Sequence, residues 1–200
     1  MHAGPLSLRG GSIDRQQDAV TPGNRREIIA ASNNIRMDAE MSIQVGDRLP
    51  DVTLHEMGEK GPQPVTTAEL FNGKKVVLFA LPGAFTPTCS AHHLPGYVVK
   101  ADELRDKGVD SIICLSVNDA WVMNAWGEAQ NVEDRVRMVA DGAAAFTKAI
   151  GLDTDMSERG FGLRSQRYAM IVDDGVVTAL HVEEPRKFEV SGAESMLAEL

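Results

Sequence analysis

The side chain with the clearest chemical potential in this chain is that of Cys89, which follows the apolar run Val76–Leu81 after a short loop. Thr86 and Pro87 form a favourable helix start, because threonine caps free N–H groups and proline lacks only an N–H that would have no partner. We therefore expect Cys89 in the first turn of a helix, where unpaired amide N–H groups and the helix dipole favour a thiolate. The thiolate is the nucleophilic form of cysteine. Cys89 is thus a candidate nucleophile, and the alternative is a small buried residue that only packs.

Two histidines follow this cysteine closely. His92 and His93 stand three and four positions after Cys89 and could share a helix face with it, which raises the possibility of zinc. A structural zinc site usually has four ligands and a catalytic site has three plus water. The remaining histidines are not at ligand spacing, and they are His2, His55 and His181. We therefore expect neither a metal site nor a bound cofactor.

The second cysteine, Cys114, lies inside the apolar run Ile112–Leu115, a pattern typical of a buried strand. A buried apolar thiol is weakly acidic and poorly accessible. A disulfide with Cys89 would also require Cα atoms within about 7 Å. The pattern therefore predicts a structural role for Cys114.

The elements that must position Cys89 alternate along the chain. Short apolar or alternating runs predict strands at residues 76–81, 109–117, 135–140, 168–172 and 176–182, and Asp174-Gly175 predicts a hairpin turn before the last of these. Helical spacing follows in residues 97–104 and 122–126, the latter after a cap at Asn118 or Asp119, and residues 191–200 predict a closing helix. Pro95-Gly96 should kink or break its helix.

This order predicts an α/β fold with a central mixed β-sheet flanked by helices. A thioredoxin-like domain has this order, although periodicity alone does not separate it from other α/β folds. With 200 residues, 43% of them hydrophobic, the chain suits one compact domain and an additional segment.

The additional segment is residues 1–40, which contain several Gly, Pro and Asn breaker signals and equal numbers of arginines and acids. They resemble neither a secretory signal nor a transit peptide. We expect a disordered N-terminal extension before a domain at 41–200. The net charge of −9 argues against nucleic-acid or anionic-membrane partners, and no apolar run approaches the ~20 residues that span a bilayer. Two sparse cysteines are typical of a reducing compartment such as the cytoplasm.

Four motifs, in order, resemble the peroxiredoxin family, and within it the type-5 group that includes plant type-II and bacterial glutaredoxin-linked members. Pro82, Thr86 and Cys89 have the spacing P-x-x-x-T-x-x-C. The other matches are His93-Leu94-Pro95-Gly96, Ser116-Val117-Asn118-Asp119-Ala120 with Trp126-Gly127, and Arg167-Tyr168-Ala169-Met170. The resemblance covers residues 42–200 and implies a thioredoxin-like fold.

The resemblance also implies the role of each site residue. Cys89 would be the peroxidatic nucleophile that becomes a sulfenic acid, Thr86 would bind the peroxide, and Pro82 would shield the thiolate. Arg167 matches the arginine that stabilises the thiolate and the peroxide. If a strand starting near Arg167 runs antiparallel to residues 76–81, Arg167 lies beside Cys89. Arg164 is the nearby alternative, and His93 matches a structural position near the site.

The function implied is a thiol peroxidase that reduces hydrogen peroxide and organic hydroperoxides in antioxidant defence. Some type-5 relatives have a late resolving cysteine, but no cysteine follows Cys114 here. We therefore expect a monothiol cycle in which glutathione with glutaredoxin is the electron donor, with thioredoxin as the alternative. The resemblance suggests a homodimer. The competing functions are a non-catalytic thioredoxin-like redox-sensing or binding module and a cysteine hydrolase, which would use His92 or His93 as base.

Overall fold

The computed structural model describes residues 42–200. The predicted extension, residues 1–40, lies outside the described residues, so that prediction stays a prediction. Within residues 42–200, no helix is long and apolar enough to cross a membrane.

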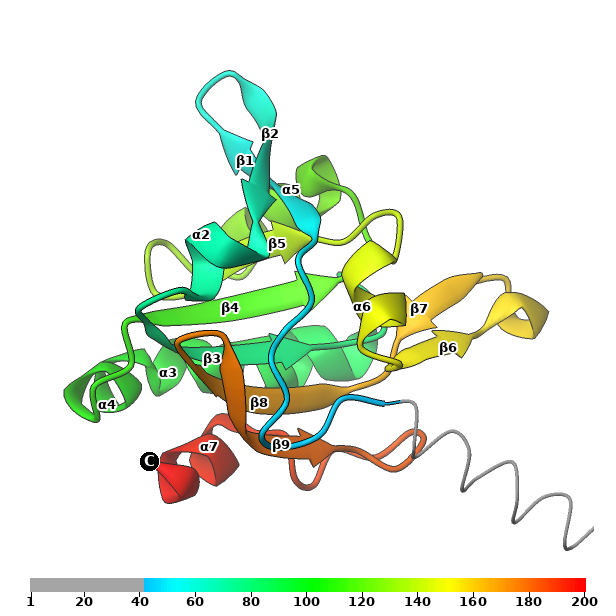
Figure 1. Ribbon diagram of the computed structural model, residues 1–200. Coiled ribbons are helices and arrows are strands. Elements are labelled where there is room, and N and C mark those ends of the chain that lie inside the picture. Colours follow the sequence, from blue (N-terminus) through cyan, green and yellow to red (C-terminus); the bar gives the residue numbers. More distant parts are fainter. Residues whose placement is uncertain (1–41) are drawn as a thin grey trace, which may run out of the picture. The chain divides into compact units, whose positions relative to one another are not determined.

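Seven strands form one mixed sheet in the order β2-β1-β5-β4-β3-β8-β9 (Figure 1). The strands are β1 (Thr53–Gly58), β2 (Gly61–Thr66), β3 (Lys75–Ala80), β4 (Ser111–Ser116), β5 (Arg137–Ala140), β8 (Tyr168–Asp173) and β9 (Val176–Val182). The central strands β5, β4 and β3 are parallel to one another, and β1 and β8 run antiparallel to them on either side. A mixed sheet is therefore confirmed.

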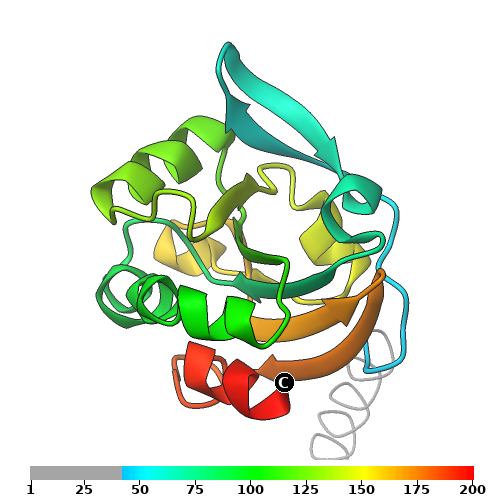
Figure 2. The ribbon, with the colours of Figure 1, turned by 90° about the vertical axis from the view of Figure 1, so that its left-hand side faces the viewer.

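Helices cover both faces of this sheet (Figure 2). One face packs against α3 (Leu94–Val99), α4 (Ala101–Asp106), α5 (Ala120–Ala129) and α7 (Ala193–Glu199), and the other against α2 (Thr67–Phe71) and α6 (Ala145–Ala149). Alternate residues of β3 supply the two cores, because side chains along a strand point to opposite faces. Phe79 packs into the first core and Leu78 into the second, and both are fully buried.

A two-stranded arm lies beyond the main sheet. Strands β6 (Asp153–Asp155) and β7 (Leu163–Ser165) pair antiparallel around the short 3₁₀ helix η2 (Ser157–Arg159). Only Gln166 and Arg167 separate β7 from β8, so the arm adjoins the start of β8 (Figure 1).

Several predicted elements differ in detail from the structure. The hairpin β1–β2 and the arm were not predicted, since their strands lack a clear apolar alternation. The helix expected over 97–104 is two short helices separated at Lys100. The turn at Asp174-Gly175 is confirmed, with φ values of +46° and +77° that fit a type I′ hairpin.

Pro95-Gly96 was expected to kink or break its helix, and the structure shows no break there. The π-helical turn η1 (Cys89–His93) runs directly into α3, and the Leu94 N–H donates to the Cys89 carbonyl five residues back. Pro95 therefore occupies the first turn of α3, where its missing N–H is tolerated.

Candidate active site

The corner between β3 and η1 carries Cys89. Helical structure begins at Pro87, as predicted, and the Thr86 carbonyl accepts a hydrogen bond of 3.0 Å from the Ser90 N–H. Cys89 is the first residue of the π-helical turn. Such turns are rare and are frequently found at functional sites.

Cys89 is fully buried, and its sulfur contacts one cationic group. Arg167 Nη2 donates to Cys89 Sγ over 3.4 Å. The contact follows from strand pairing, because Tyr168 of β8 lies opposite Ala80 at the end of β3, which puts Arg167 beside the corner. The Cys89 sulfur therefore faces a fixed positive charge.

Thr86 and Pro82 border the same corner. The Thr86 hydroxyl donates to the Gly83 carbonyl over 2.8 Å, which leaves its oxygen lone pairs available as acceptors. The Pro82 carbonyl accepts from Arg164 Nη1 over 3.5 Å. Arg164, the alternative to Arg167, is thus directed at the backbone of the corner, whereas Arg167 contacts the sulfur.

His93 holds the other edge of the Arg167 guanidinium. Arg167 Nη1 lies 2.9 Å from His93 Nδ1, and arginine has no acceptor, so Nδ1 is the acceptor and Nε2 carries the proton. Nε2 then donates to the Ser191 carbonyl over 3.0 Å. Burial, helped by the Arg167 charge, lowers the pKa of His93 to about 3. His93 is therefore a neutral imidazole that orients Arg167.

A carboxylate organises the loop on which His93 depends. Glu183 Oε1 accepts from the backbone N–H groups of Glu189, Val190 and Ser191 and from the Ser191 hydroxyl, at 2.8–2.9 Å. Burial alone would raise the pKa of Glu183, but these donors outweigh it and lower the pKa.

The same loop is connected to Arg167 and to α3. The Glu183 N–H donates to the Arg167 carbonyl over 2.9 Å, and Tyr97 Oη donates to the Ser191 carbonyl over 2.8 Å. Sequence reasoning missed Glu183, Ser191 and Tyr97 as parts of the site, because no local motif relates them to Cys89. The position of His93, four residues after Cys89 on one helical segment, was the signal available for the imidazole.

Cys114 is buried in β4, opposite Phe79 of β3. Burial raises the pKa of the Cys114 thiol well above its ordinary value, and the neighbouring Cys89 acts in the same direction. Both cysteines are free thiols. His92 is exposed whereas His93 is buried, and residues 42–200 contain no group of three or more His, Cys, Asp or Glu side chains suited to a metal ion.

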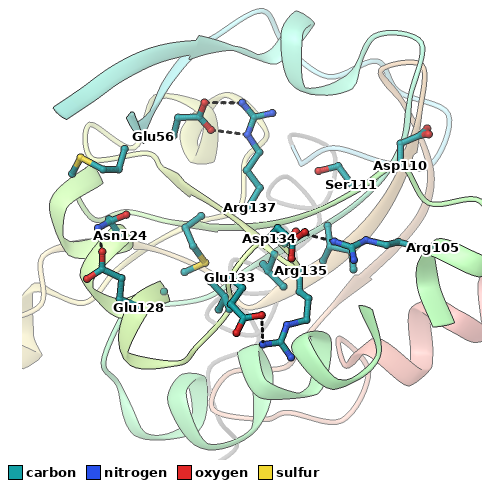
Figure 3. Close-up of a pocket in the computed structure, with 16 residues that line it drawn as sticks. Glu56, Arg105, Asp110, Ser111, Asn124, Glu128, Glu133, Asp134, Arg135 and Arg137 are labelled. Carbon is teal, nitrogen blue, oxygen red and sulfur yellow. Dashed lines mark hydrogen bonds and ion pairs between the residues drawn. The ribbon is translucent and has the colours of Figure 1, made fainter. Parts of the chain in front are cut away.

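Two cavities differ in whether residues of the Cys89 site line them. A cavity of about 670 Å³ includes Pro82 and Arg167 in its wall. Another, of about 450 Å³, shares no lining residue with the site. Figure 3 shows two of its arginines paired with glutamates, Arg137 with Glu56 at 2.6 and 2.7 Å and Arg135 with Glu133 at 3.4 Å. The site at the end of β3 is therefore a buried thiol faced by a fixed guanidinium, which is the arrangement of a thiol-dependent redox enzyme.

Comparison with known proteins agrees with this class. The family model described as Redoxin matches residues 44–197. "Peroxiredoxin-2E-2, chloroplastic" of Oryza sativa is 51% identical over 164 residues, which cover 80% of this chain and 73% of the rice protein. "Peroxiredoxin-2D" of Arabidopsis thaliana is 46% identical over 159 residues, covering 79% of this chain and 98% of the relative.

A solved structure gives the same result. The crystal structure of reduced Prx3 in complex with hydrogen peroxide from Vibrio vulnificus has a TM-score of 0.75 and 61% identity, and the match covers 78% of this chain and 98% of that one. The chain therefore belongs to the peroxiredoxin family, with a thioredoxin-like fold, and it is an oxidoreductase of the peroxidase class.

Proposed function

We propose that the protein reduces hydrogen peroxide and organic hydroperoxides with Cys89 as the peroxidatic residue. The Cys89 thiolate attacks one peroxide oxygen, so that an S–O bond forms and the O–O bond breaks. The leaving oxygen takes a proton and departs as water or an alcohol, and Cys89 becomes a sulfenic acid. The observation that carries this proposal is the 3.4 Å contact between Arg167 Nη2 and Cys89 Sγ.

The neighbours of Cys89 have defined parts in this proposal. Arg167 stabilises the thiolate and the negative charge that develops on the leaving oxygen. Thr86 binds the peroxide through its hydroxyl, whose oxygen can accept the peroxide's hydrogen. Pro82, half-buried at the edge of the corner, limits the access of water to the thiolate.

The proposed cycle uses a single thiol of the protein. One glutathione converts the Cys89 sulfenic acid to a mixed disulfide, and a second glutathione or glutaredoxin returns Cys89 to the thiol. The buried position and raised pKa of Cys114 support this assignment, because a resolving thiol must be accessible and ionised. Thioredoxin is the alternative donor, and no bound cofactor is part of the cycle.

The proposal includes a homodimer in a reducing compartment, with the cytoplasm as the first candidate. Sedimentation at micromolar concentration would test the dimer, and the expected mass is twice the 21.6 kDa of one chain. A single-chain mass would remove the dimer from the proposal without affecting the thiol chemistry.

Intact mass spectrometry tests the cycle. Pre-reduced protein receives one equivalent of hydrogen peroxide with glutathione present, and we expect a glutathione adduct that maps to Cys89. The Cys89→Ser variant should form no adduct and show no turnover. A loss of two hydrogens that joins Cys89 to Cys114 would instead make Cys114 the resolving thiol. Unmodified Cys89 after peroxide treatment would contradict the peroxidatic assignment.

A further inference from the structure

The cavity of about 670 Å³ is lined by Pro82 and Arg167, two residues of the Cys89 site. The rest of the lining comes from residues 154–159 of the β6–β7 arm, residues 165–166 before Arg167, and residues 183–187 after β9. Its volume lies within the range of roughly 300–1,000 Å³ that small-molecule sites have. Arg167, which donates to Cys89 Sγ, thus also lines a cavity large enough for a tripeptide.

The charges in this cavity are mixed and partly unpaired. Two arginines, Arg159 and Arg186, come one from each loop, and within residues 42–200 neither side chain makes a hydrogen bond or ion pair. Glu158 and Glu184 lie next to them in the lining, and their carboxylates likewise have no partner within the described chain. Elsewhere in the cavity, Glu183 is occupied by the loop that it organises.

We propose that this cavity is the glutathione subsite, with Arg159 and Arg186 binding one carboxylate of the tripeptide each. Guanidinium groups suit carboxylates because they donate two parallel hydrogen bonds. Glutathione has two carboxylates for the two unpaired arginines and one ammonium group for the neighbouring glutamates. A ligand with a single negative charge would fit this set of charges less well. The inference rests on the proposed function, in which glutathione resolves Cys89.

The position of the cavity agrees with the chemistry it would serve. The glutathione sulfur attacks the Cys89 sulfenic sulfur, so that an S–S bond forms and the S–O bond breaks, and the hydroxyl leaves with the thiol proton as water. Cys89 is fully buried, so the residues that cover it must move before a thiol as large as glutathione reaches its sulfur. A tripeptide in the cavity would contact Arg167, which itself contacts that sulfur.

The cavity arginines would also counteract the repulsion between glutathione and the negatively charged protein. The protein has a net charge of −9 and glutathione is an anion, so the protein as a whole repels its proposed reductant. Hydrogen peroxide is neutral, so the net charge of the protein does not repel it. The arginines of the cavity would therefore affect the glutathione step and leave the peroxide step unchanged.

The test compares two double variants that each remove two cations. Arg159→Gln/Arg186→Gln alters the cavity, and Lys60→Gln/Lys148→Gln is the control, since both lysines are exposed, outside the cavity and without a side-chain partner within residues 42–200. Stopped-flow measurements give the rate of oxidation by hydrogen peroxide, then the rate at which glutathione or neutral 2-mercaptoethanol reduces the sulfenic acid.

We expect the cavity variant to react with glutathione about tenfold or more slowly, as expected for lost charge-assisted hydrogen bonds. Its rates with hydrogen peroxide and 2-mercaptoethanol should match those of the wild type, as should all rates of the lysine control. Arg159→Lys/Arg186→Lys should restore part of the glutathione rate, because the charge is kept and the paired donors are lost.

Other outcomes would overturn the subsite in distinguishable ways. A wild-type glutathione rate in the cavity variant would reject the subsite and leave the monothiol cycle intact. A wild-type protein whose sulfenic acid does not react with glutathione would reject the proposed donor and the subsite together. A cavity variant impaired only toward a fatty-acid hydroperoxide would assign the arginines to an anionic peroxide instead.

Discussion

At the scale of single residues, Arg167 divides its donors between two acceptors that differ in kind. One amino group faces the Cys89 sulfur at 3.4 Å, and the other faces the neutral Nδ1 of His93 at 2.9 Å. The guanidinium also lies over the Phe188 ring, 5.7 Å from its centroid. Three fixed contacts of this kind leave the charge little freedom to move away from the sulfur, so the site is preorganised for a thiolate.

The first prediction concerns this division of donors. Arg167→Lys keeps the charge, but one ammonium group cannot donate to two separated acceptors in the way that a planar guanidinium does. We expect the second-order rate with hydrogen peroxide to fall by about 10²–10³, as for the loss of one preorganised donor. The rate is measured by stopped flow, and the alkylation of Cys89 by iodoacetamide at a fixed pH should slow as well. Arg164→Lys is the control, and an equal loss in that variant would contradict the assignment of Arg167.

The second prediction concerns His93 and stability in acid. The pKa of His93 is about 3 in the folded protein, whereas an unfolded histidine titrates near 6.5. Between these values the unfolded chain binds the additional proton, so the free energy of unfolding falls as pH falls from about 6.5 toward 3. The slope approaches about 1.4 kcal/mol per pH unit. Urea unfolding at pH 7, 6 and 5 measures it.

His93→Gln should flatten the slope between pH 6.5 and 5, and His92→Gln, at an exposed position, should leave it unchanged. The window stops at pH 5 because Glu183 and Glu56 have lowered pKa values, and the stability that they contribute is lost only below about 4.5. Equal slopes in the wild type and His93→Gln would show that His93 is not held neutral by the fold.

At the scale of elements, the loop between β9 and α7 has one carboxylate at its centre. The third prediction is that Glu183→Gln destabilises the protein by about 2–3 kcal/mol, because a neutral amide accepts more weakly from the backbone N–H groups of residues 189–191. Chemical unfolding measures this change. The loop carries the Ser191 carbonyl that holds His93, so the alkylation of Cys89 at a fixed pH should also slow. Glu184→Gln, one residue along and exposed, is the control.

A purely structural role for Glu183 would lower stability without slowing the alkylation of Cys89. That result would contradict the connection from Glu183 through Ser191 and His93 to Arg167. If Glu183→Gln does not fold, Ser191→Ala offers a milder test. It removes only the hydroxyl that donates a hydrogen bond to Glu183 and keeps the Ser191 backbone N–H.

The elements differ in how far the sequence could predict them. The strands that became β3, β8 and β9 were found because their apolar runs are short and bounded by clear turn residues. The start of the helix at Pro87 followed from the chemistry of Thr86-Pro87. The π-helical turn after it was not predicted, because a five-residue widening leaves no period that a short apolar pattern can reveal.

The residues of the candidate site also differ in how far the sequence could predict them. Pro82, Thr86 and Cys89 are close in sequence, and Arg167 could be located because antiparallel pairing with residues 76–81 would bring it to the corner. Glu183 and Ser191 could not be found, since their role depends on a loop that bends back on itself and meets η1 only in the folded chain. Local chemistry was therefore predictable, and the residues that orient it required tertiary structure.

At the scale of the whole molecule, the sheet separates two apolar layers, and both cysteines belong to the one that includes α3, α5 and α7. Cys89 lies at its edge against Arg167, whereas Cys114 lies inside it on a central strand. This difference in position supports the proposed roles, with Cys89 as the reacting thiol and Cys114 as a packing residue. Burial alone does not distinguish them, because both side chains are fully buried.

The last prediction separates packing from chemistry at Cys114. Cys114→Ser puts a hydroxyl without a partner into the apolar layer and should lower the free energy of unfolding by about 1–3 kcal/mol. Cys114→Ala has no such polar group and should cost less. Because Cys114 takes no part in the proposed cycle, turnover of hydrogen peroxide with glutathione should stay within about twofold of the wild type in both variants, provided that assays run well below the unfolding midpoint. A folded Cys114→Ala protein whose Cys89 is oxidised normally but is not reduced again would make Cys114 the resolving thiol. The apolar layer around Cys114 would then have to open in each turnover.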